Sequence, residues 1–320
     1  MRFRLVPDTT NIDFFRYMRF WLAVSIIGVI GSFVSLAIFG LNYGVDFRGG
    51  TLIMAATPEA HEVGEFRTLL TGLDVGEVGV TTASDATGAG RHVVLMRLGV
   101  TGEDATNQRA AIATVQGALD KAFPGITYLQ VDSVGAKVSE ELVRDGVIAV
   151  LLSVVGIMIY VWLRFEWQFG LGAAASLLHD AIVVVGLFSV FQLEFNLTIV
   201  AAVLTVLGYS INDTVVVFDR VREVLRKYKK MPLRDVLNLA LNETLSRTVM
   251  TVLTTLLALI AILLFGGQTV RGFAIAVIFG ILIGTYSSIY VASAVVLRLG
   301  VRRDWGAQKA EADAKRDARA

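Results

Sequence analysis

The stretch LTIVAAVLTVLGYSINDTVVVF, residues 197–218, decides the fold of this chain. It is long enough to cross the ~30 Å hydrocarbon core of a membrane, which takes about 20 apolar residues in a helix. Its single carboxylate is Asp213. An Asp at the centre of a membrane helix costs about 2.5–3.5 kcal/mol on insertion scales, so an acid in such a stretch indicates a functional site. We interpret residues 197–218 as a membrane helix that carries a working carboxylate.

The composition of the whole chain indicates an integral membrane protein. Of its 320 residues, 55% are hydrophobic and only 18% are charged, and the mean hydropathy is +0.65. These values are too apolar for a soluble chain of this length. We therefore predict an α-helical polytopic membrane protein with six transmembrane helices, at residues 20–41, 146–163, 169–191, 197–218, 248–265 and 272–297.

Basic residues predict the orientation, because Lys and Arg concentrate in short cytoplasmic connections. They cluster in the N-terminal segment 1–19, in the loop 219–247 and in the tail 298–320. An even number of spans places all three on one side, which we take as cytoplasmic. Topology and anionic lipid explain these clusters, so no nucleic-acid partner is expected. The predicted layout is a cytoplasmic segment 1–19, a first transmembrane helix 20–41, an exported (periplasmic) domain 42–141, helices 2–6 within 142–297, and a cytoplasmic tail 298–320.

The exported segment reads as one small α+β domain. Periodicity predicts strands at 51–57, 75–82, 91–98 and 127–134, helices at 58–70 and 103–123, and a turn at 84–90. The order β-α-β-β-α-β is the ferredoxin-like arrangement. The chain has no cysteine, so the domain must be held by its own core. His61 and His92 lack a second ligand at a useful spacing, and we expect no metal or cofactor.

Polar side chains recur at helical spacing on the fourth and fifth spans. Those of the fourth are Thr205, Tyr209, Asn212 and Asp213, and those of the fifth are Arg247, Thr251, Thr254 and Thr255. If the two stripes face each other, they line a path for water. A buried carboxylate without a partner stays protonated, whereas a nearby guanidinium favours its charged form. An Asp213–Arg247 pair that opens and closes is therefore a proton switch.

Structural explanations compete with this interpretation at several positions. Membrane threonines often donate only to their own backbone or across the bundle, and an arginine at a helix end can simply snorkel to the interface. Asp213 and Arg247 could also form a static ion pair. His179 and Asp180, near the middle of the third span, are either relay partners or a hydrogen-bond anchor. Gly280 and Gly284 form a small-xxx-small pair, which favours close helix packing.

Several longer motifs carry a resemblance to a known family. They are VDFRGG at 45–50, LRFEW at 163–167, HD at 179–180, LGYSINDTVVVFDRVRE at 207–223, NETLSRTVMT at 242–251, FGG at 265–267 and GTYSS at 284–288. Over nearly its whole length the chain resembles the SecF branch of the SecD/SecF protein-export family, within the resistance-nodulation-division superfamily. In this resemblance Asp213 and Arg247 match the proton-pathway positions, and Asn212 and Asp219 lie in the same motif.

The resemblance implies a function and partners. It implies a non-enzymatic subunit of the bacterial inner membrane that pairs with SecD and works beside the SecYEG channel with YajC and YidC. Such a subunit uses the proton gradient to move unfolded secretory polypeptides. Two alternatives stay open: a half-transporter for small molecules, and a non-transporting assembly scaffold, for which Asp213→Asn would be silent.

Overall fold

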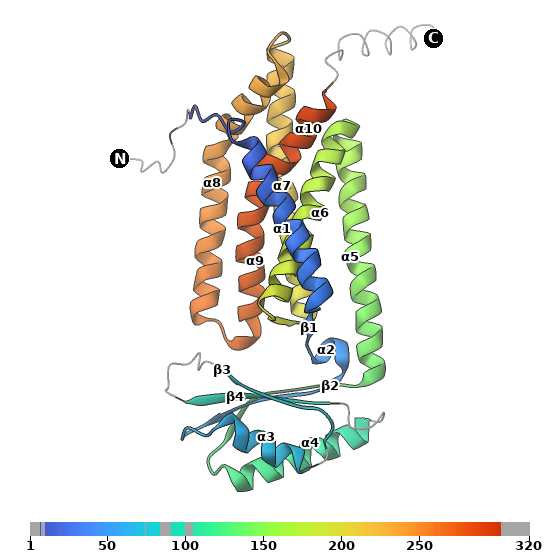
Figure 1. The fold of residues 1–320 in the computed structure, drawn as a ribbon, viewed down its shortest axis with the longest axis vertical. Helices are drawn as coiled ribbons and strands as arrows, with labels where there is room; N and C mark the ends of the chain where they lie inside the picture. The colour runs from blue at the N-terminus through green and yellow to red at the C-terminus, as the bar shows by residue number, and fades with distance from the viewer. Residues whose placement is uncertain (1–6, 8–9, 74, 84–90, 100–104, 302–320) are drawn as a thin grey trace, which may run out of the picture.

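The chain folds into a helical bundle with a small sheet domain at one end, as seen in this computed structural model (Figure 1). The structure describes residues 7, 10–73, 75–83, 91–99 and 105–301. Within these residues, six helical segments are long and apolar enough to cross a membrane, in agreement with the predicted number. They are α1 (Met18–Ile38), α5 (Ala136–Arg164), α6 (Trp167–Val190), α7 (Leu197–Lys227), α8 (Leu233–Phe265) and the sixth span, in which α9 (Gln268–Ser287) continues through a π-helical turn η1 (Ser288–Ala292) into α10 (Ser293–Leu299).

Helices α6, α7 and α9 form the centre of the bundle, and small residues let them approach. A Cβ atom on Gly280 of α9 would lie 2.2 Å from the Cγ2 atom of Val206 on α7. Likewise, a Cβ atom on Gly186 of α6 would lie 2.0 Å from the hydroxyl of Ser32 on α1. The outer helices α5 and α8 stand at the two sides of the bundle (Figure 1) and expose many apolar side chains. Those faces suit lipid or an apolar partner.

The connection between the fourth and fifth spans is shorter than predicted. The expected loop 219–247 is almost entirely helical, because α7 continues to Lys227 and α8 begins at Leu233. Charged residues indicate where a helix leaves the membrane, but they do not end the helix here. Arg, Glu, Leu and Lys are all good helix formers. Buried side chains on both extensions, such as Val224 and Leu237, pack in one core and hold them together.

The sheet domain has four antiparallel strands in the order β3-β4-β2-β5. The strands and the two covering helices are β2 (Gly50–Thr57), α3 (Val63–Thr71), β3 (Val78–Ala83), β4 (His92–Leu98), α4 (Ala105–Ala122) and β5 (Thr127–Val134). Helices α3 and α4 lie on the side of the sheet away from the bundle (Figure 1), and Phe66, Leu119 and their neighbours fill the core between them.

Two boundaries in this domain were predicted wrongly. Strand β3 begins at Val78, three residues after the predicted start at 75. Helix α3 begins at Val63, five residues after Pro58, where the sequence predicted its start. The Thr57 hydroxyl donates to the Glu59 carbonyl at 2.9 Å and holds the chain in a turn after β2. The helix then begins where Phe66 and Leu70 reach the core. The predicted turn at 84–90 lies outside the described residues.

The sheet domain is fastened to the bundle at the start of α7. Strand β1 (Asn42–Tyr43), just after α1, pairs in parallel with β6 (Glu194–Phe195), just before α7. Between β1 and β2 lies the short helix α2 (Val45–Arg48). There the Asp46 carboxylate accepts a hydrogen bond from the backbone N–H of Leu197, the first residue of α7, at 3.0 Å. A Cβ atom on Gly44 would lie 2.8 Å from the Glu194 carboxylate, so a larger residue there would displace the Glu194 side chain.

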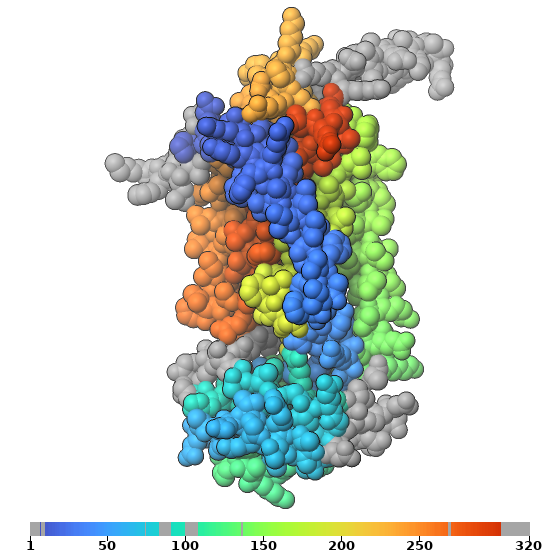
Figure 2. Space-filling view, viewed as in Figure 1, coloured from blue at the N-terminus to red at the C-terminus, as the bar shows by residue number. Residues whose placement is uncertain are grey.

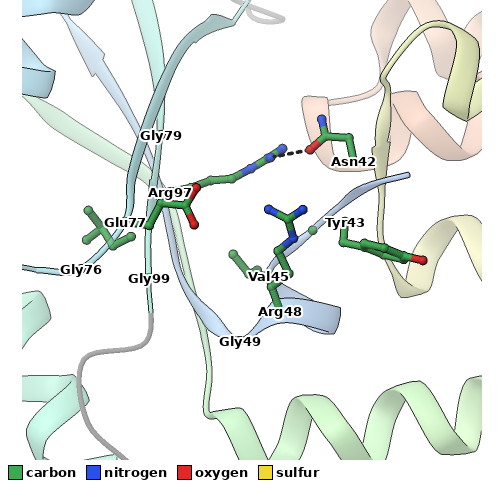
Figure 3. A pocket seen from close by; sticks show the side chains of 12 residues that line it. Asn42, Tyr43, Val45, Arg48, Gly49, Gly76, Glu77, Gly79, Arg97 and Gly99 are labelled. Atoms are coloured by element: carbon green, nitrogen blue, oxygen red, sulfur yellow. Dashed lines mark hydrogen bonds between the residues drawn. The ribbon is translucent and has the colours of Figure 1, made fainter. Parts of the chain in front are cut away.

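An ion pair closes the same junction from the sheet side. The Arg97 guanidinium of β4 donates to Glu194 at 2.5 Å and to the Asn42 side chain at 3.2 Å. Arg97 and Arg48 point into the same cavity of about 680 Å³ (Figure 3). The space-filling view shows the sheet domain close against the bundle (Figure 2). The sheet domain is therefore linked to the start of α7 by direct hydrogen bonds and an ion pair.

We expect a charge reversal at this junction to loosen the domain. Arg97→Glu should speed amide hydrogen exchange in β1, β6 and the first turn of α7 by roughly tenfold, since a hydrogen-bonded charge contributes about 1.5–3 kcal/mol. The swap Arg97→Glu with Glu194→Arg should restore slow exchange. Fast exchange in both the single and the swapped variant would show that the pair does not hold the junction.

Candidate functional site

Asp213 lies inside the bundle rather than on its lipid-facing surface. Its side chain is only 4% exposed, and it lines a cavity of about 10 Å³ between α7, α8 and the sixth span. Such a cavity holds at most about one water molecule. The other lining residues are Val217, Leu241, Thr244, Leu245, Thr248, Thr285, Ser288 and Ile289. The acid therefore sits in a small and mostly apolar space.

The Asp213 carboxylate has no hydrogen bond and no ion pair within 4.0 Å to any residue that the structure describes. Arg247 is the charge that acts on it from α8. However, the Arg247 side chain is exposed, and its neighbour Thr248 takes the inward position on the helix. Asp213 and Arg247 are therefore neighbours that do not form an ion pair.

The predicted polar stripes meet at only one point. Thr205 and Asn212 are exposed on the outer side of α7, because successive residues of a helix turn by about 100°. The Tyr209 hydroxyl lies 3.3 Å from the Thr255 hydroxyl and links α7 to α8. Asp219 lies eight residues before the end of α7, where it pairs with Arg164 of α5 at 2.9 Å.

The threonines of the fifth span bond mainly within their own helix. The hydroxyls of Thr251, Thr254 and Thr255 all donate to backbone carbonyls of α8. This is the structural alternative that the sequence left open. Within the described residues, the Tyr209–Thr255 contact is the one hydrogen bond that joins the two stripes.

Asp180 stands at the centre of a hydroxyl cluster. It is fully buried on α6, and its Oδ2 atom accepts hydrogen bonds from Ser210 of α7 at 2.6 Å and from Ser287 of α9 at 2.9 Å. His179 Nδ1 lies 3.0 Å from the Oδ1 atom. The Ser287 hydroxyl also lies 2.8 Å from that of Ser176. Sequence reasoning placed His179 and Asp180 but missed these serines, because a serine in a membrane helix can equally bond its own backbone.

The glycine pair of the sixth span packs inside this chain. A Cβ atom on Gly284 would lie 3.0 Å from Ser210 Cβ and 3.5 Å from the Asp180 carboxylate. Together with Gly280 it lets α9 approach α7 closely enough for the serines to reach Asp180. These glycines therefore face α7.

No group of three metal-ligating side chains occurs within the described ranges. His61 contacts Glu65 at 3.2 Å and packs against Phe123, as a surface histidine does.

Comparison with known proteins identifies relatives of the whole chain. Residues 114–302 match the family described as "Protein export membrane protein SecD/SecF, C-terminal", and residues 34–53 match the SecD/SecF GG motif. The chain is 51% identical over 305 residues to a protein translocase subunit SecF of Cereibacter sphaeroides, with 94% of each chain covered. It is 42% identical over 301 residues to the subunit of that name from Rickettsia rickettsii, covering 94% of this chain and 95% of the relative.

Among solved structures, the fold resembles a crystal structure of SecDF, a translocon-associated membrane protein from Thermus. The TM-score is 0.80 at 34% identity, over 92% of this chain. A second SecDF crystal structure, in a super-membrane-facing form, gives a TM-score of 0.66 at 34% identity over all of this chain. The chain spans only 39% and 41% of those two SecDF chains.

Proposed function

This chain belongs to the SecD/SecF family of protein-export membrane proteins, in its SecF branch, and from that membership we propose that it couples proton flow to the export of polypeptides. In this proposal Asp213 takes up and releases a proton, Arg247 closes on the charged form, and the exported domain moves in response. The chain is a multi-pass protein of the bacterial inner membrane, and both termini are cytoplasmic.

The observation that carries the proposal is that one helix joins the acid to the exported domain. Helix α7 begins at Leu197, whose N–H is held by Asp46 at the junction with the sheet domain. Asp213 lies sixteen residues further along the same helix, about 24 Å at 1.5 Å per residue. A shift of α7 driven by the charge on Asp213 therefore acts directly on the junction.

The energy of a few protons is sufficient for such a cycle. One charge that crosses the membrane potential yields about 2.3 kcal/mol per 100 mV. A two-state equilibrium needs about 5.5 kcal/mol to swing from 1:99 to 99:1. Roughly three protons per cycle are enough at a potential of about 100 mV.

The family membership also supports the partners. We propose that SecD supplies the second six-helix half, and that the pair works beside SecYEG with YajC and YidC on unfolded secretory polypeptides. The exported β-α-β-β-α-β segment and its strand order suit a ferredoxin-like domain that contacts such polypeptides. The exposed apolar faces of α5 and α8 suit membrane lipid and SecD.

Export into inverted membrane vesicles tests the proposal against its alternatives. Vesicles that contain this chain and SecD should export a secretory protein faster than vesicles without it, and an uncoupler should remove the gain. A gain that survives the uncoupler would favour an assembly scaffold. Uncoupler-sensitive efflux of a small apolar dye, with no gain in export, would favour a half-transporter.

A further inference from the structure

We propose that His179 and Asp180 form a second proton-holding site, electrostatically coupled to Asp213. This inference rests on the proposed proton coupling and extends it to a residue pair on another helix. Both side chains lie in the middle of α6 and are buried, with His179 7% exposed and Asp180 0% exposed. Their bonding pattern and their position beside the Asp213 cavity carry the inference.

The contacts of Asp180 fit a charged carboxylate. Its Oδ2 atom accepts two hydroxyl hydrogens, from Ser210 and Ser287, and its Oδ1 atom faces His179 Nδ1 at 3.0 Å. In its ionised state Asp180 only accepts hydrogen bonds, so Nδ1 of His179 then donates to it. The Nε2 atom, which bonds to no residue that the structure describes, can take up a proton. Uptake at Nε2 turns the imidazole into an imidazolium and breaks none of these three contacts. The pair then changes from one negative charge to neutral, and release reverses the step.

Among the groups around Asp180, His179 is the one that can neutralise its negative charge. No Lys or Arg forms an ion pair with Asp180 in the described part of the chain. Titratable groups on the packed elements include Tyr286 of α9, whose ring centre lies 6.1 Å from that of His179, Tyr290 of η1, whose ring centre lies 5.4 Å from that of Tyr286, and Asp213 of α7. The Tyr286 hydroxyl is bonded to Ser25 of α1 at 2.8 Å, and Arg247 of α8 lies beyond Asp213. A charge without a counter-charge costs free energy at this depth in the membrane. The charge on Asp180 is therefore linked to the protonation of His179.

Two hydroxyl contacts bring the pair next to the Asp213 cavity. Thr214, the residue after Asp213, lies 2.7 Å from Ser288 through their hydroxyls, and Ser288 lines the cavity. Ser287, the residue before Ser288, binds Asp180. Both serines lie at the start of the π-helical turn η1, and such turns often occur at functional sites. A change of charge on Asp180 therefore alters the electrostatic potential at Asp213, and the reverse also holds.

Nitrogen NMR of His179 tests the proton-holding role directly. The chain has three histidines, so His61→Gln with His92→Gln leaves His179 as the only one. In the complex with SecD, the ¹⁵N signals of His179 should show Nδ1–H throughout and reversible protonation of Nε2 over the pH range in which the complex stays assembled. Asp213→Asn should shift the midpoint of that titration. An Nε2 atom that stays unprotonated over this range, or a midpoint that ignores Asp213→Asn, would overturn the inference.

Proton flux in reconstituted vesicles with SecD separates this inference from the proposed function. His179→Asn keeps a donor towards Asp180 but has no second nitrogen, and it should lower flux at least tenfold, an effect of the size seen when a proton-transfer group is removed. Ser287→Ala removes one donor and keeps the pair, so its loss should be clearly smaller. Equal losses in these two variants would assign the cluster a structural role and overturn the inference. Normal flux in His179→Asn with lost flux in Asp213→Asn would overturn only the inference, whereas normal flux in both would overturn the proposed function as well.

Discussion

Asp213→Asn should abolish the part of export that depends on the proton gradient, while the complex still assembles. The amide is nearly the same size as the carboxylate, but it cannot take up or release a proton at ordinary pH. Because no described residue hydrogen-bonds to the carboxylate, the change leaves no buried partner unsatisfied. Folding and insertion are therefore expected to be unaffected. The measurement is export into inverted vesicles, where the variant should match wild-type vesicles treated with an uncoupler.

Asp219→Asn provides a matched control on the same helix. Asp219 lies six residues further along α7 and pairs with Arg164 at a largely exposed position. An exposed pair of this kind contributes at most about 1 kcal/mol. The control should keep most of the uncoupler-sensitive export. Similar losses in both variants would show that any change of charge on α7 impairs the protein, and would remove the special role of Asp213.

Gly280→Ala should destabilise the helix bundle. In an ordinary helix this change stabilises by about 0.5–1 kcal/mol, because alanine is the better helix former. Here the added Cβ atom would lie 2.2 Å from Val206 Cγ2 and 2.6 Å from Cγ1. A valine side chain is stiff and cannot turn away, so α9 must move from α7, at a cost of about 1–3 kcal/mol. Thermal unfolding of the purified complex should show a lower midpoint.

A second substitution tests the cause of that loss. Val206→Ala removes both clashing methyl groups, so the double variant should recover most of the midpoint lost by Gly280→Ala. Gly208→Ala serves as the control, because a Cβ atom there meets no atom within 4 Å. It should be neutral or slightly stabilising. Equal destabilisation by the Gly280 and Gly208 substitutions, or no recovery by Val206→Ala, would contradict close packing of α9 on α7 as the cause.

Much of the fold was predictable because apolar length is a strong signal. The number of membrane helices followed from residues such as 197–218, and the strands of the sheet domain followed from alternation, with β5 at 127–134 as predicted. Helix ends were harder to predict. The helical extensions to Lys227 and from Leu233 depend on packing against residues far away in the chain, such as Phe15 and Phe165, and a local sequence pattern does not reveal such packing.

The site was predictable in part, for a similar reason. A lone acid such as Asp213 is visible in any apolar stretch, but the side of α8 on which Arg247 emerges depends on how α8 is rotated against α7. The serines around Asp180 were missed because the bonded residues lie on three different helices. No single segment of sequence therefore shows them at a regular spacing. Coordinates were needed to show that Ser210 and Ser287 converge on the same oxygen.

The most direct measurement of the central claim is proton flux through the chain reconstituted with SecD in vesicles that carry an internal pH-sensitive dye. An imposed pH gradient should drive proton entry with the wild-type chain and with Asp219→Asn, and almost none with Asp213→Asn. Wild-type flux in the Asp213→Asn vesicles would contradict the claim that this buried carboxylate carries the proton.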